Sequence, residues 1–224
     1  MNSMTLLGKM GTRFGLIIIG LGALIFVPAG TPAFWQGWVF LAAVFVPMTA
    51  VVIYLARHDP GLLARRLQTH EKEAPQKLVQ KVGGIFMLAL AVVPGLDRRW
   101  GWSHVPPAVV IAADAVFVGA YLFIFRVFRF NSYASRTVEV VAGQKLIDSG
   151  PYALVRHPMY LGSLALYLAM PVALGSFWAL LAYLPLPFVF GYRARNEEQV
   201  LMRELAGYED YVKRVRARIV PGIW

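Results

Sequence analysis

Long runs of residues without a charge constrain this chain more than any other feature of its sequence. Residues 14–29, 33–56 and 82–96 carry no charged side chain, and residues 105–128 form a fourth apolar run that Asp114 interrupts. A helix needs about 20 apolar residues to cross the hydrocarbon core of a bilayer. The whole sequence is 58% hydrophobic and 15% charged, whereas soluble domains are about 25% charged. The pattern predicts an all-α, polytopic membrane helix bundle.

The longest uncharged run, residues 159–192, is too long for a single span. A straight helix over these 34 residues would extend about 51 Å, against a hydrocarbon core of about 30 Å. Gly175 and Ser176 lie at the midpoint. We therefore expect a hairpin of two shorter helices, which brings the number of transmembrane helices to about six. Without the hairpin the number would be five.

Lysine and arginine are divided unequally between the two sides that six spans define. Twenty of the 22 lie in the N-terminus, the 57–81 loop, the 126–156 region or the C-terminal tail, and only Arg98 and Arg99 fall on the other side. Loops rich in these residues stay in the cytoplasm. We therefore expect an integral protein of the bacterial inner membrane, with both termini and the 129–158 segment cytoplasmic.

The first apolar run resembles a signal peptide because Lys9 and Arg13 precede it. It lacks a clear small-residue cleavage site, and another apolar run follows at once, so we interpret it as a retained first helix. No internal repeat or soluble domain is evident. Residues 1–224 are therefore expected to form a single membrane domain.

The polar stretch 57–81 cannot lie in hydrocarbon. Within it, Leu62, Leu63 and Leu67 alternate with basic residues at helical spacing. This pattern fits an interfacial amphipathic helix, and it fits an ordinary solvated loop equally well.

Composition excludes several classes of function. The absence of cysteine rules out disulfides, thiolate metal sites and a cysteine nucleophile. The net charge is +10, but no basic–aromatic binding motif accompanies it, and basic residues that flank spans bind anionic lipids. We therefore expect membrane lipid rather than nucleic acid as the partner of these charges.

Two polar segments of unusual composition adjoin the ends of the predicted hairpin. Residues 150–160 read GPYALVRHPMY, and residues 193–198 read RARNEE. If the hairpin forms, both segments lie at the mouth of one helix pair, where their side chains can converge on one site. Their mixed charges suit a ligand that carries both an ammonium and a carboxylate. Alternatively, the arginines only anchor the spans, and Pro158 only begins a helix.

These motifs carry a resemblance to a known family. RHPMY at 156–160 is followed by RARNEE, by LAGYEDYVKRV at 205–215 and by PGIW at 221–224. In this order they resemble the isoprenylcysteine carboxyl methyltransferases, membrane enzymes that use S-adenosylmethionine and are related to phospholipid N-methyltransferases. The resemblance is strongest over residues 128–224, and residues 59–66 and 131–135 also look like bacterial members.

The resemblance implies a division of roles. Residues 1–128 would supply the N-terminal spans, whereas the cytoplasmic loops and the amphipathic C-terminal helix of residues 129–224 would form the cofactor-binding and catalytic region. The implied catalytic residues are Arg156, Arg195 and Glu197. The residues implied to bind S-adenosylmethionine are Tyr152, Val155, His157, Pro158, Tyr160 and Glu198.

Elementary chemistry is compatible with these roles. A sulfonium is attracted to carboxylates and aromatic faces, and an arginine fork binds a carboxylate. No glycine-rich strand–turn–helix motif occurs, which disfavours a soluble methyltransferase fold of the dinucleotide-binding type. His157 has no second histidine or cysteine at ligand spacing, so we expect no metal.

Three further residues are candidates for contact with the substrate. Asp114 is the acid within a predicted span, and such residues are usually functional, although it could instead form a hydrogen bond inside the bundle. Asn131 and Tyr133 belong to a segment that resembles bacterial family members.

The predicted function is transfer of a methyl group from S-adenosylmethionine to a lipophilic acceptor, either a small molecule or a prenylated one. The resemblance implies an isoprenylcysteine-type carboxylate, and the residues leave open a phospholipid amine or a small thiol. A small transporter is disfavoured because paired interrupted spans and an inverted repeat are not apparent. A non-catalytic scaffold would not need both motifs. We expect the cofactor to enter from the cytoplasm and the acceptor to enter laterally beside Tyr160.

The charge distribution generates a topology prediction. A reporter fused after Trp224 is expected to be active in the cytoplasm, because a five-span arrangement would place the basic tail outside. Paired fusions to a reporter active only in the cytoplasm and to one active only outside it measure this. Activity of the external reporter alone would show that the predicted topology is wrong.

Overall fold

The computed structural model of the chain describes residues 3–67, 74–134, 140–141 and 143–224. Regular structure in these ranges is entirely helical, which confirms the predicted fold class. The elements in chain order are α1 (Ser3–Ala29), α2 (Trp35–His58), α3 (Pro60–Leu67), α4 (Ala74–Trp100), α5 (Pro107–Phe130), η1 (Gly150–Ala153), α6 (Pro158–Ala173), α7 (Leu180–Tyr183), α8 (Leu186–Glu204) and α9 (Tyr208–Arg214).

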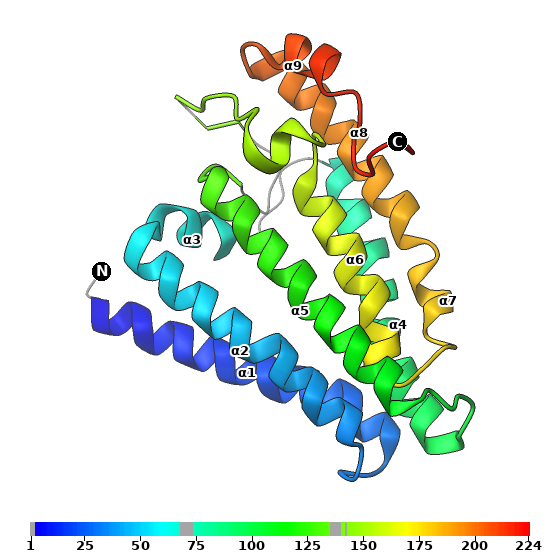
Figure 1. The fold of residues 1–224 in the computed structure, drawn as a ribbon. Coiled ribbons are helices and arrows are strands. Elements are labelled where there is room, and N and C mark those ends of the chain that lie inside the picture. Colours follow the sequence, from blue (N-terminus) through cyan, green and yellow to red (C-terminus); the bar gives the residue numbers. More distant parts are fainter. Residues whose placement is uncertain (1–2, 68–73, 135–139, 142) are drawn as a thin grey trace.

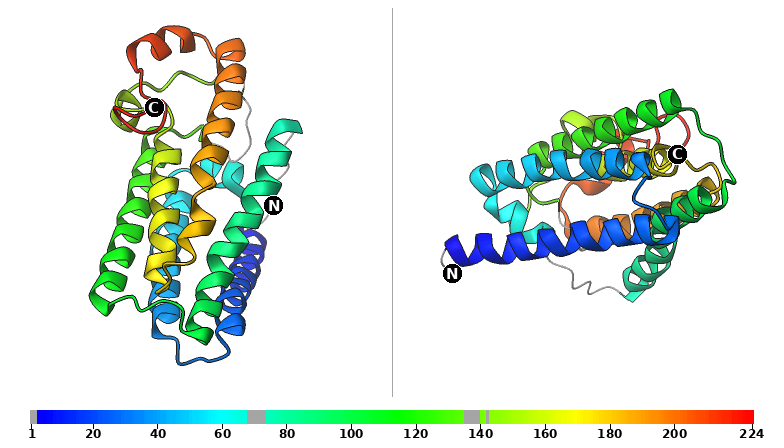
Figure 2. Two further views of the ribbon diagram at one scale, coloured as in Figure 1. Left: turned by 90° about the vertical axis from the view of Figure 1, so that its right-hand side faces the viewer. Right: turned by 90° about the horizontal axis from the view of Figure 1, so that it is seen from below.

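The long helices form a bundle whose two ends differ (Figure 1). The elements α3, η1 and α9 gather at one end, here called the site end, and the connections 30–34, 101–106 and 174–179 lie at the opposite end. A turned view shows α8 between α6 and α4 (Figure 2). The chain therefore returns after α6, as the predicted hairpin requires, and both polar segments reach the site end.

Three helices of the described residues are long and apolar enough to cross a membrane, namely α2, residues 79–100 of α4, and α5. The apolar part of α1, Gly15–Ala29, and helix α6 are shorter. The second arm of the hairpin is not one helix, contrary to the prediction of two helices. It consists of α7, which has four residues, and of α8, which continues into charged sequence.

Glycine and proline account for this interrupted arm. Gly175 adopts φ +73°, in the left-handed region where glycine is favoured, and turns the chain after α6. Pro185 stands at the N-cap of α8, and Pro187 lies in its first turn. Because proline lacks an N–H and its ring clashes with the preceding turn, a helix begins rather than continues at such a site.

Residues 60–67 of the polar stretch after α2 form the helix α3, as the amphipathic interpretation of their sequence requires. In α3, Leu62 and Leu63 are buried, and they pack with Val51 of α2 and Phe128 of α5. The side chain of Asp59 accepts the backbone N–H of Leu62 at 2.8 Å, which satisfies one donor in the first turn of α3.

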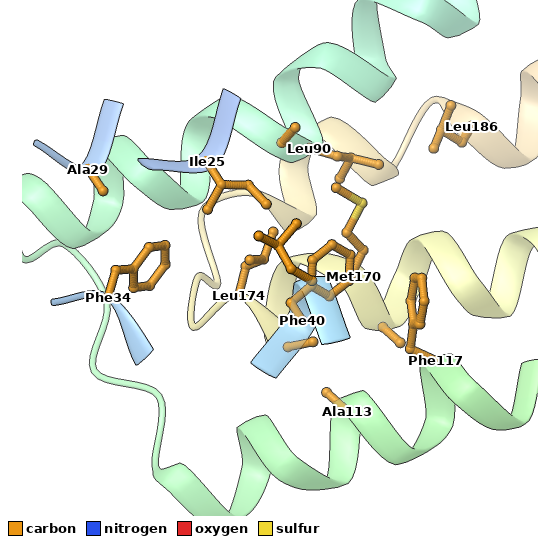
Figure 3. Close-up of a cluster of buried hydrophobic side chains, with 14 residues drawn as sticks. Ile25, Ala29, Phe34, Phe40, Leu90, Ala113, Phe117, Met170, Leu174 and Leu186 are labelled. Carbon is orange, nitrogen blue, oxygen red and sulfur yellow. The ribbon is translucent and has the colours of Figure 1, made fainter. Parts of the chain in front are cut away.

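The hydrophobic core lies where α1, α2, α4, α5, α6 and α8 meet (Figure 3). Phe40 of α2 and Phe117 of α5 are in edge-to-face contact, with ring centroids 4.9 Å apart. Leu90 of α4, Met170 of α6 and Ile25 of α1 belong to the same cluster. The core therefore connects these helices and fixes the directions in which α4, α5 and α6 leave toward the site end.

A buried carboxylate closes the opposite end of the bundle. Asp97 near the end of α4 is 1% exposed. It accepts the backbone N–H and the hydroxyl of Ser103, each at 2.6 Å, and also the hydroxyl of Ser176. The end of α4, the loop before α5 and the turn after α6 are thereby held together.

This cluster generates a stability prediction. Asp97→Ala is expected to lower the free energy of unfolding by about 2–4 kcal/mol, because three hydrogen bonds to a charged acceptor are lost and buried hydroxyls are left unpaired. A lower apparent melting temperature of the detergent-solubilised protein measures this. Arg98→Ala, at an exposed neighbour, is the control, and an equal effect of both variants would contradict the assignment.

Candidate functional site

The chain enters the site end through a turn that only glycine fits. Gly150 adopts φ +59°, and a Cβ atom at this position would lie 2.4 Å from Cε1 of the Phe130 ring. The close approach to the end of α5 lets η1 fold back over the bundle. Pro158 then begins α6, a position where its missing N–H costs nothing.

The C-terminal tail runs beside the short segment before α6. The backbone N–H of Arg156 donates to the carbonyl of Ala217 at 3.0 Å, and that of His157 donates to the carbonyl of Arg218 at 2.8 Å. The Nη1 atom of Arg156 also donates to the carbonyls of Val215 and Arg216, both at 2.8 Å. Residues far apart in the sequence thus form one backbone layer at the site.

Glu198 of α8 joins this layer to the bundle. Its side chain is 3% exposed. Oε1 accepts from Nε of Arg156 at 2.6 Å and from Nε2 of His157 at 3.1 Å. Oε2 accepts from Nε of Arg218 at 2.9 Å. One buried carboxylate therefore holds three cationic or polar side chains from two other segments.

The protonation state of Glu198 follows from these contacts. Burial by itself raises the pKa of its carboxyl group, but the hydrogen bonds from His157 and Arg156 and the charges of both outweigh it and lower the pKa to about 2. The carboxylate is therefore ionised at neutral pH, and the ring of His157 must donate to it through Nε2.

A second polar chain stands beside the first. The hydroxyl of Tyr160 donates to Oε2 of Glu197 at 2.6 Å and accepts from Nε of Arg193 at 2.9 Å. The ring of Tyr160 is stacked on that of His157, with centroids 5.3 Å apart and planes at 9°. Because α8 presents residues 193 and 197 one turn apart, a single tyrosine of α6 bridges both.

A pocket with polar walls, here called the polar pocket, opens among these elements. It encloses about 830 Å³ including its mouth. Its wall residues come from residues 131–134 and 144–147, from η1, from the start of α6, and from α8 and α9. They include Asn131, Tyr133, Lys145, Leu146, Tyr152, Arg156, His157, Pro158, Met159, Tyr160, Glu197, Leu201, Tyr208 and Tyr211.

Two hydrogen bonds fix the wall of the polar pocket at Tyr152. Nδ2 of Asn131 donates to the hydroxyl of Tyr152 at 2.8 Å, and the hydroxyl of Tyr211 donates to the Tyr152 carbonyl at 2.7 Å. Burial raises the pKa of Tyr152 to about 12, although the hydrogen bond from Asn131 acts against it. The phenol therefore stays neutral, and Asn131 has a positioning role here in addition to lining the pocket.

A second cavity, here called the apolar pocket, lies between α4, α5, α6 and α8. It encloses about 1540 Å³ including its opening. Its wall is mostly aliphatic and aromatic, and Arg66 and Arg193 are the charged members among the described residues. Met159 and Tyr160 line both pockets, so the two cavities meet at the start of α6.

The structure brings most of the predicted site residues to the polar pocket, but not all. Arg195 points to the other side of α8, where its guanidinium lies 5.6 Å from the ring centroid of Trp224, and it lines no wall of the polar pocket. Successive side chains of a helix point in different directions around its axis, so consecutive residues of RARNEE cannot all share one face. Val155 is buried behind the wall, and Glu198 supports the site from beneath it.

Asp114 lines neither pocket. It belongs to the first third of α5, whereas Asn131 follows the last turn of this helix. Seventeen residues of helix correspond to about 25 Å, which separates Asp114 from the polar pocket. The apolar pocket comes nearer, because Tyr121 of α5 lines it two helical turns away. Asp114 is 6% exposed, and neither of its carboxylate oxygens has a hydrogen-bond partner among the described residues. Its contact with substrate stays a prediction.

Sequence reasoning missed several pocket residues in the C-terminal region. Tyr208 and Tyr211 line the polar pocket from α9, and Arg218 of the tail binds Glu198. The tyrosines stand at i and i+3 in LAGYEDYV, which places both on one face of a helix. That spacing was a usable signal, whereas nothing local in the sequence marks Arg218.

The donor set of the polar pocket fits the predicted cofactor. Aromatic rings and the carboxylate of Glu197 can attract a sulfonium, and the wall also offers Lys145 and His157 to a carboxylate. Among the described residues, no three histidine or acidic side chains lie together as a metal site.

Comparison with known proteins finds two partial matches. Residues 108–207 match the phospholipid methyltransferase family. This range contains all of α5 but its first residue and the whole of η1, α6, α7 and α8, and the match supports a membrane methyltransferase. Over 91 residues, 39% of the chain, the sequence is also 34% identical to Delta(14)-sterol reductase from Mus musculus. The chain covers 22% of the length of that enzyme, so this likeness is partial.

The buried carboxylate generates a prediction about stability and pH. Glu198→Gln is expected to lower the free energy of unfolding at neutral pH by about 3 kcal/mol, because buried guanidinium groups lose their counter-charge. The pKa of Glu198 is lowered from 4.5 to about 2. The stability it contributes is therefore present above pH 4.5 and is lost as the pH falls toward 2.

Melting curves of the wild type and of Glu198→Gln, recorded between pH 3 and pH 7, check this. The difference in melting temperature between the two proteins should narrow toward the acidic end. Glu204→Gln, at an exposed position of the same helix, should match the wild type throughout. A Glu198→Gln deficit that did not change with pH would contradict the ionised role of this residue.

Proposed function

We propose that this chain, whose residues 108–207 match the phospholipid methyltransferase family, transfers a methyl group from S-adenosylmethionine to a lipophilic acceptor. The cofactor would occupy the polar pocket, and the acceptor would occupy the apolar pocket. The start of α6, where the two pockets meet, would be the place of transfer.

One observation carries the proposal. Met159 and Tyr160 line both pockets, so ligands bound on either side are separated by little more than one layer of side chains. A displacement reaction needs its two reactants aligned and in contact, and positioning alone can supply much of the rate. A polar and an apolar cavity that open onto the same two residues provide such an arrangement.

S-Adenosylmethionine, when bound, supplies an electrophilic methyl group, which an acceptor atom takes with its own electron pair while the electrons of the carbon–sulfur bond stay on sulfur. The residues of the chain bind and orient the two reactants and exclude water from them. Glu197 and the ring of Tyr160 are placed to attract positive charge on the cofactor side. Glu198 holds Arg156 and His157 in place.

The charge of the apolar pocket favours an acceptor with an anionic head. Arg66 and Arg193 enter an otherwise apolar wall from α3 and α8. Guanidinium groups bind carboxylates and phosphates through paired hydrogen bonds. An ionised carboxylate is also the acceptor that needs no general base, in agreement with the isoprenylcysteine-type acceptor that the sequence resemblance implies.

A phospholipid amine is the second candidate acceptor, favoured by the family match. Its phosphate could bind the same arginines, but its nitrogen must lose a proton before or during methylation. Glu197 is then the proton acceptor that the site offers, since its carboxylate lines the polar pocket. The two candidates therefore assign different tasks to Glu197.

The membrane orientation follows from the same assignment. S-Adenosylmethionine is a water-soluble compound of the cytoplasm, so the site end is proposed to face the cytoplasm. Twenty of the 22 lysine and arginine residues lie in segments expected on that side. The acceptor would approach through the bilayer, directly into the apolar pocket.

A labelling experiment tests the function. The purified protein, incubated with methyl-labelled S-adenosylmethionine and membrane lipid extract, is expected to transfer label to lipid. Base-labile label indicates a methyl ester, and base-stable label on nitrogen indicates an amine acceptor. Label in neither form, with a cofactor that binds, would show that the proposed reaction is wrong.

A blocking variant tests the assignment of the apolar pocket. Gly84 lines this pocket, and a Cβ atom there would meet nothing within 4 Å. Gly84→Phe should therefore fill the pocket without a clash and raise the KM for the lipophilic acceptor about tenfold, a change of about 1.4 kcal/mol, with an unchanged Kd for S-adenosylmethionine. Gly162 is unsuitable for this experiment, since a Cβ atom there would lie 2.6 Å from Cγ1 of Ile124.

The matched control is Gly119→Phe. Gly119 of α5 is also exposed, also has open space around it and lines neither pocket. This variant should behave as the wild type does. Equal losses for both variants, or a Gly84→Phe protein that loses cofactor affinity instead, would contradict the assignment.

A further inference from the structure

The polar pocket has four tyrosines that are largely shielded from solvent: Tyr152, Tyr160, Tyr208 and Tyr211. Three of their hydroxyl groups have protein partners. The side-chain amide of Asn131 donates to the hydroxyl of Tyr152 at 2.8 Å, and the hydroxyl of Tyr160 donates to the carboxylate of Glu197 at 2.6 Å. Tyr211 donates to the backbone carbonyl of Tyr152 at 2.7 Å. Groups of the protein therefore satisfy the hydrogen bonding of these three hydroxyls.

Tyr208 is different. Its side chain is 3% exposed, and its hydroxyl has no hydrogen-bond partner among the described residues. Buried polar groups of native proteins are nearly always paired, and each exception requires an explanation. The oxygen is shielded from solvent, so bulk water does not supply the partner. Tyr208 lines the polar pocket, so a ligand that fills this pocket and displaces the side chains covering the oxygen is in a position to supply it.

The ring of Tyr208 is held rigidly. Gly207 adopts φ +80° immediately before it, which lets α9 start in a new direction. The ring packs on Tyr211, with centroids 5.6 Å apart, and in a cluster with Leu205 and Leu146. A hydroxyl on a fixed ring loses little freedom when it pairs with a ligand, which makes such a contact effective.

The protonation state of Tyr208 defines what it can pair with. Burial raises the pKa of its phenol, and the negative charges of Glu198 and Glu197 raise it further. The hydroxyl therefore keeps its proton at neutral pH and is available as a donor. A donor needs an acceptor atom, which a sulfonium methyl group does not offer. Sugar oxygens, ring nitrogens and a carboxylate do offer one.

We infer that Tyr208 is a ligand-binding residue of the polar pocket, whose hydroxyl donates a hydrogen bond to an acceptor atom of an adenosyl amino acid. The inference rests on the proposed function, because that function places S-adenosylmethionine in this pocket. It adds a residue of α9 to the binding site. It also specifies that the contact is to a part of the ligand that methyl transfer does not change.

The test compares two identical substitutions three residues apart. Tyr208→Phe is expected to weaken binding of S-adenosylmethionine about fivefold to tenfold, while the melting temperature of the ligand-free protein stays unchanged or rises, because an unpaired hydroxyl has been removed from the interior. Tyr211→Phe should instead lower the melting temperature of the ligand-free protein, because its hydroxyl holds the Tyr152 carbonyl. Calorimetry and melting curves in detergent measure both effects.

A second ligand sharpens the experiment. S-Adenosylhomocysteine shares the sugar, the base and the carboxylate of the cofactor but lacks the sulfonium. Tyr208→Phe should therefore weaken binding of both ligands by the same factor. The control variant Tyr192→Phe, at an exposed position of α8, should change neither binding nor stability.

Distinct outcomes separate this inference from the function on which it rests. If the wild type bound neither ligand, the proposed function would be wrong and the inference would fall with it. If the wild type bound both and Tyr208→Phe bound them equally well, only the inference would be overturned. A loss confined to S-adenosylmethionine, or a melting temperature lowered as far as in Tyr211→Phe, would also overturn it.

Discussion

The site depends on one buried carboxylate. Taking Glu198 out of water is costly unless it is paired and hydrogen-bonded on both oxygens, and the chain meets this requirement with Arg156, His157 and Arg218. These donors come from the segment before α6 and from the tail, so neither segment can move without exposing an unpaired charge. A single electrostatic requirement therefore sets the position of η1, of the start of α6 and of the tail relative to α8. The walls of the polar pocket are built on that arrangement.

The helix bundle forms the polar pocket and the apolar pocket around this arrangement. Helix α8 is apolar in its first two turns and charged in the remainder, so it lines the apolar pocket with Val189 and Phe190 and the polar pocket with Glu197 and Leu201. Helix α6 crosses the boundary at Tyr160. At the opposite end, the Asp97 cluster holds the turn that lets the α7–α8 arm return beside α6. The separation of a polar pocket from an apolar one is thus a consequence of how one charged helix enters an apolar bundle.

Part of this organisation could be read from the sequence. The return of the chain near Gly175 follows from length alone, since 34 uncharged residues exceed the thickness of a bilayer, and it predicts that residues 150–160 and 193–198 meet. They do meet, around Glu198 and Tyr160. Arg195 lies apart from the other predicted site residues, because the rotation of α8 that turns residue 197 toward the polar pocket turns residue 195 away from it. Asp114 lies far from the polar pocket, since its depth along α5 depends on where that helix begins.

The sequence by itself determined the helical class, the hairpin, the concentration of basic charge at one end and the two motifs that meet there. These properties depend on hydrophobicity and length, which act locally along the chain. Only the tertiary structure decided which side chains face the pockets, that the tail and Arg218 complete the shell of Glu198, and that Tyr208 is left with an unpaired hydroxyl at the wall. Those properties depend on helix rotation and on the packing of segments that can be more than a hundred residues apart, such as α3 and α8, whose Arg66 and Arg193 line one pocket. Such contacts are set by packing and by the pairing of buried charges, and neither has a period or a spacing that a sequence displays.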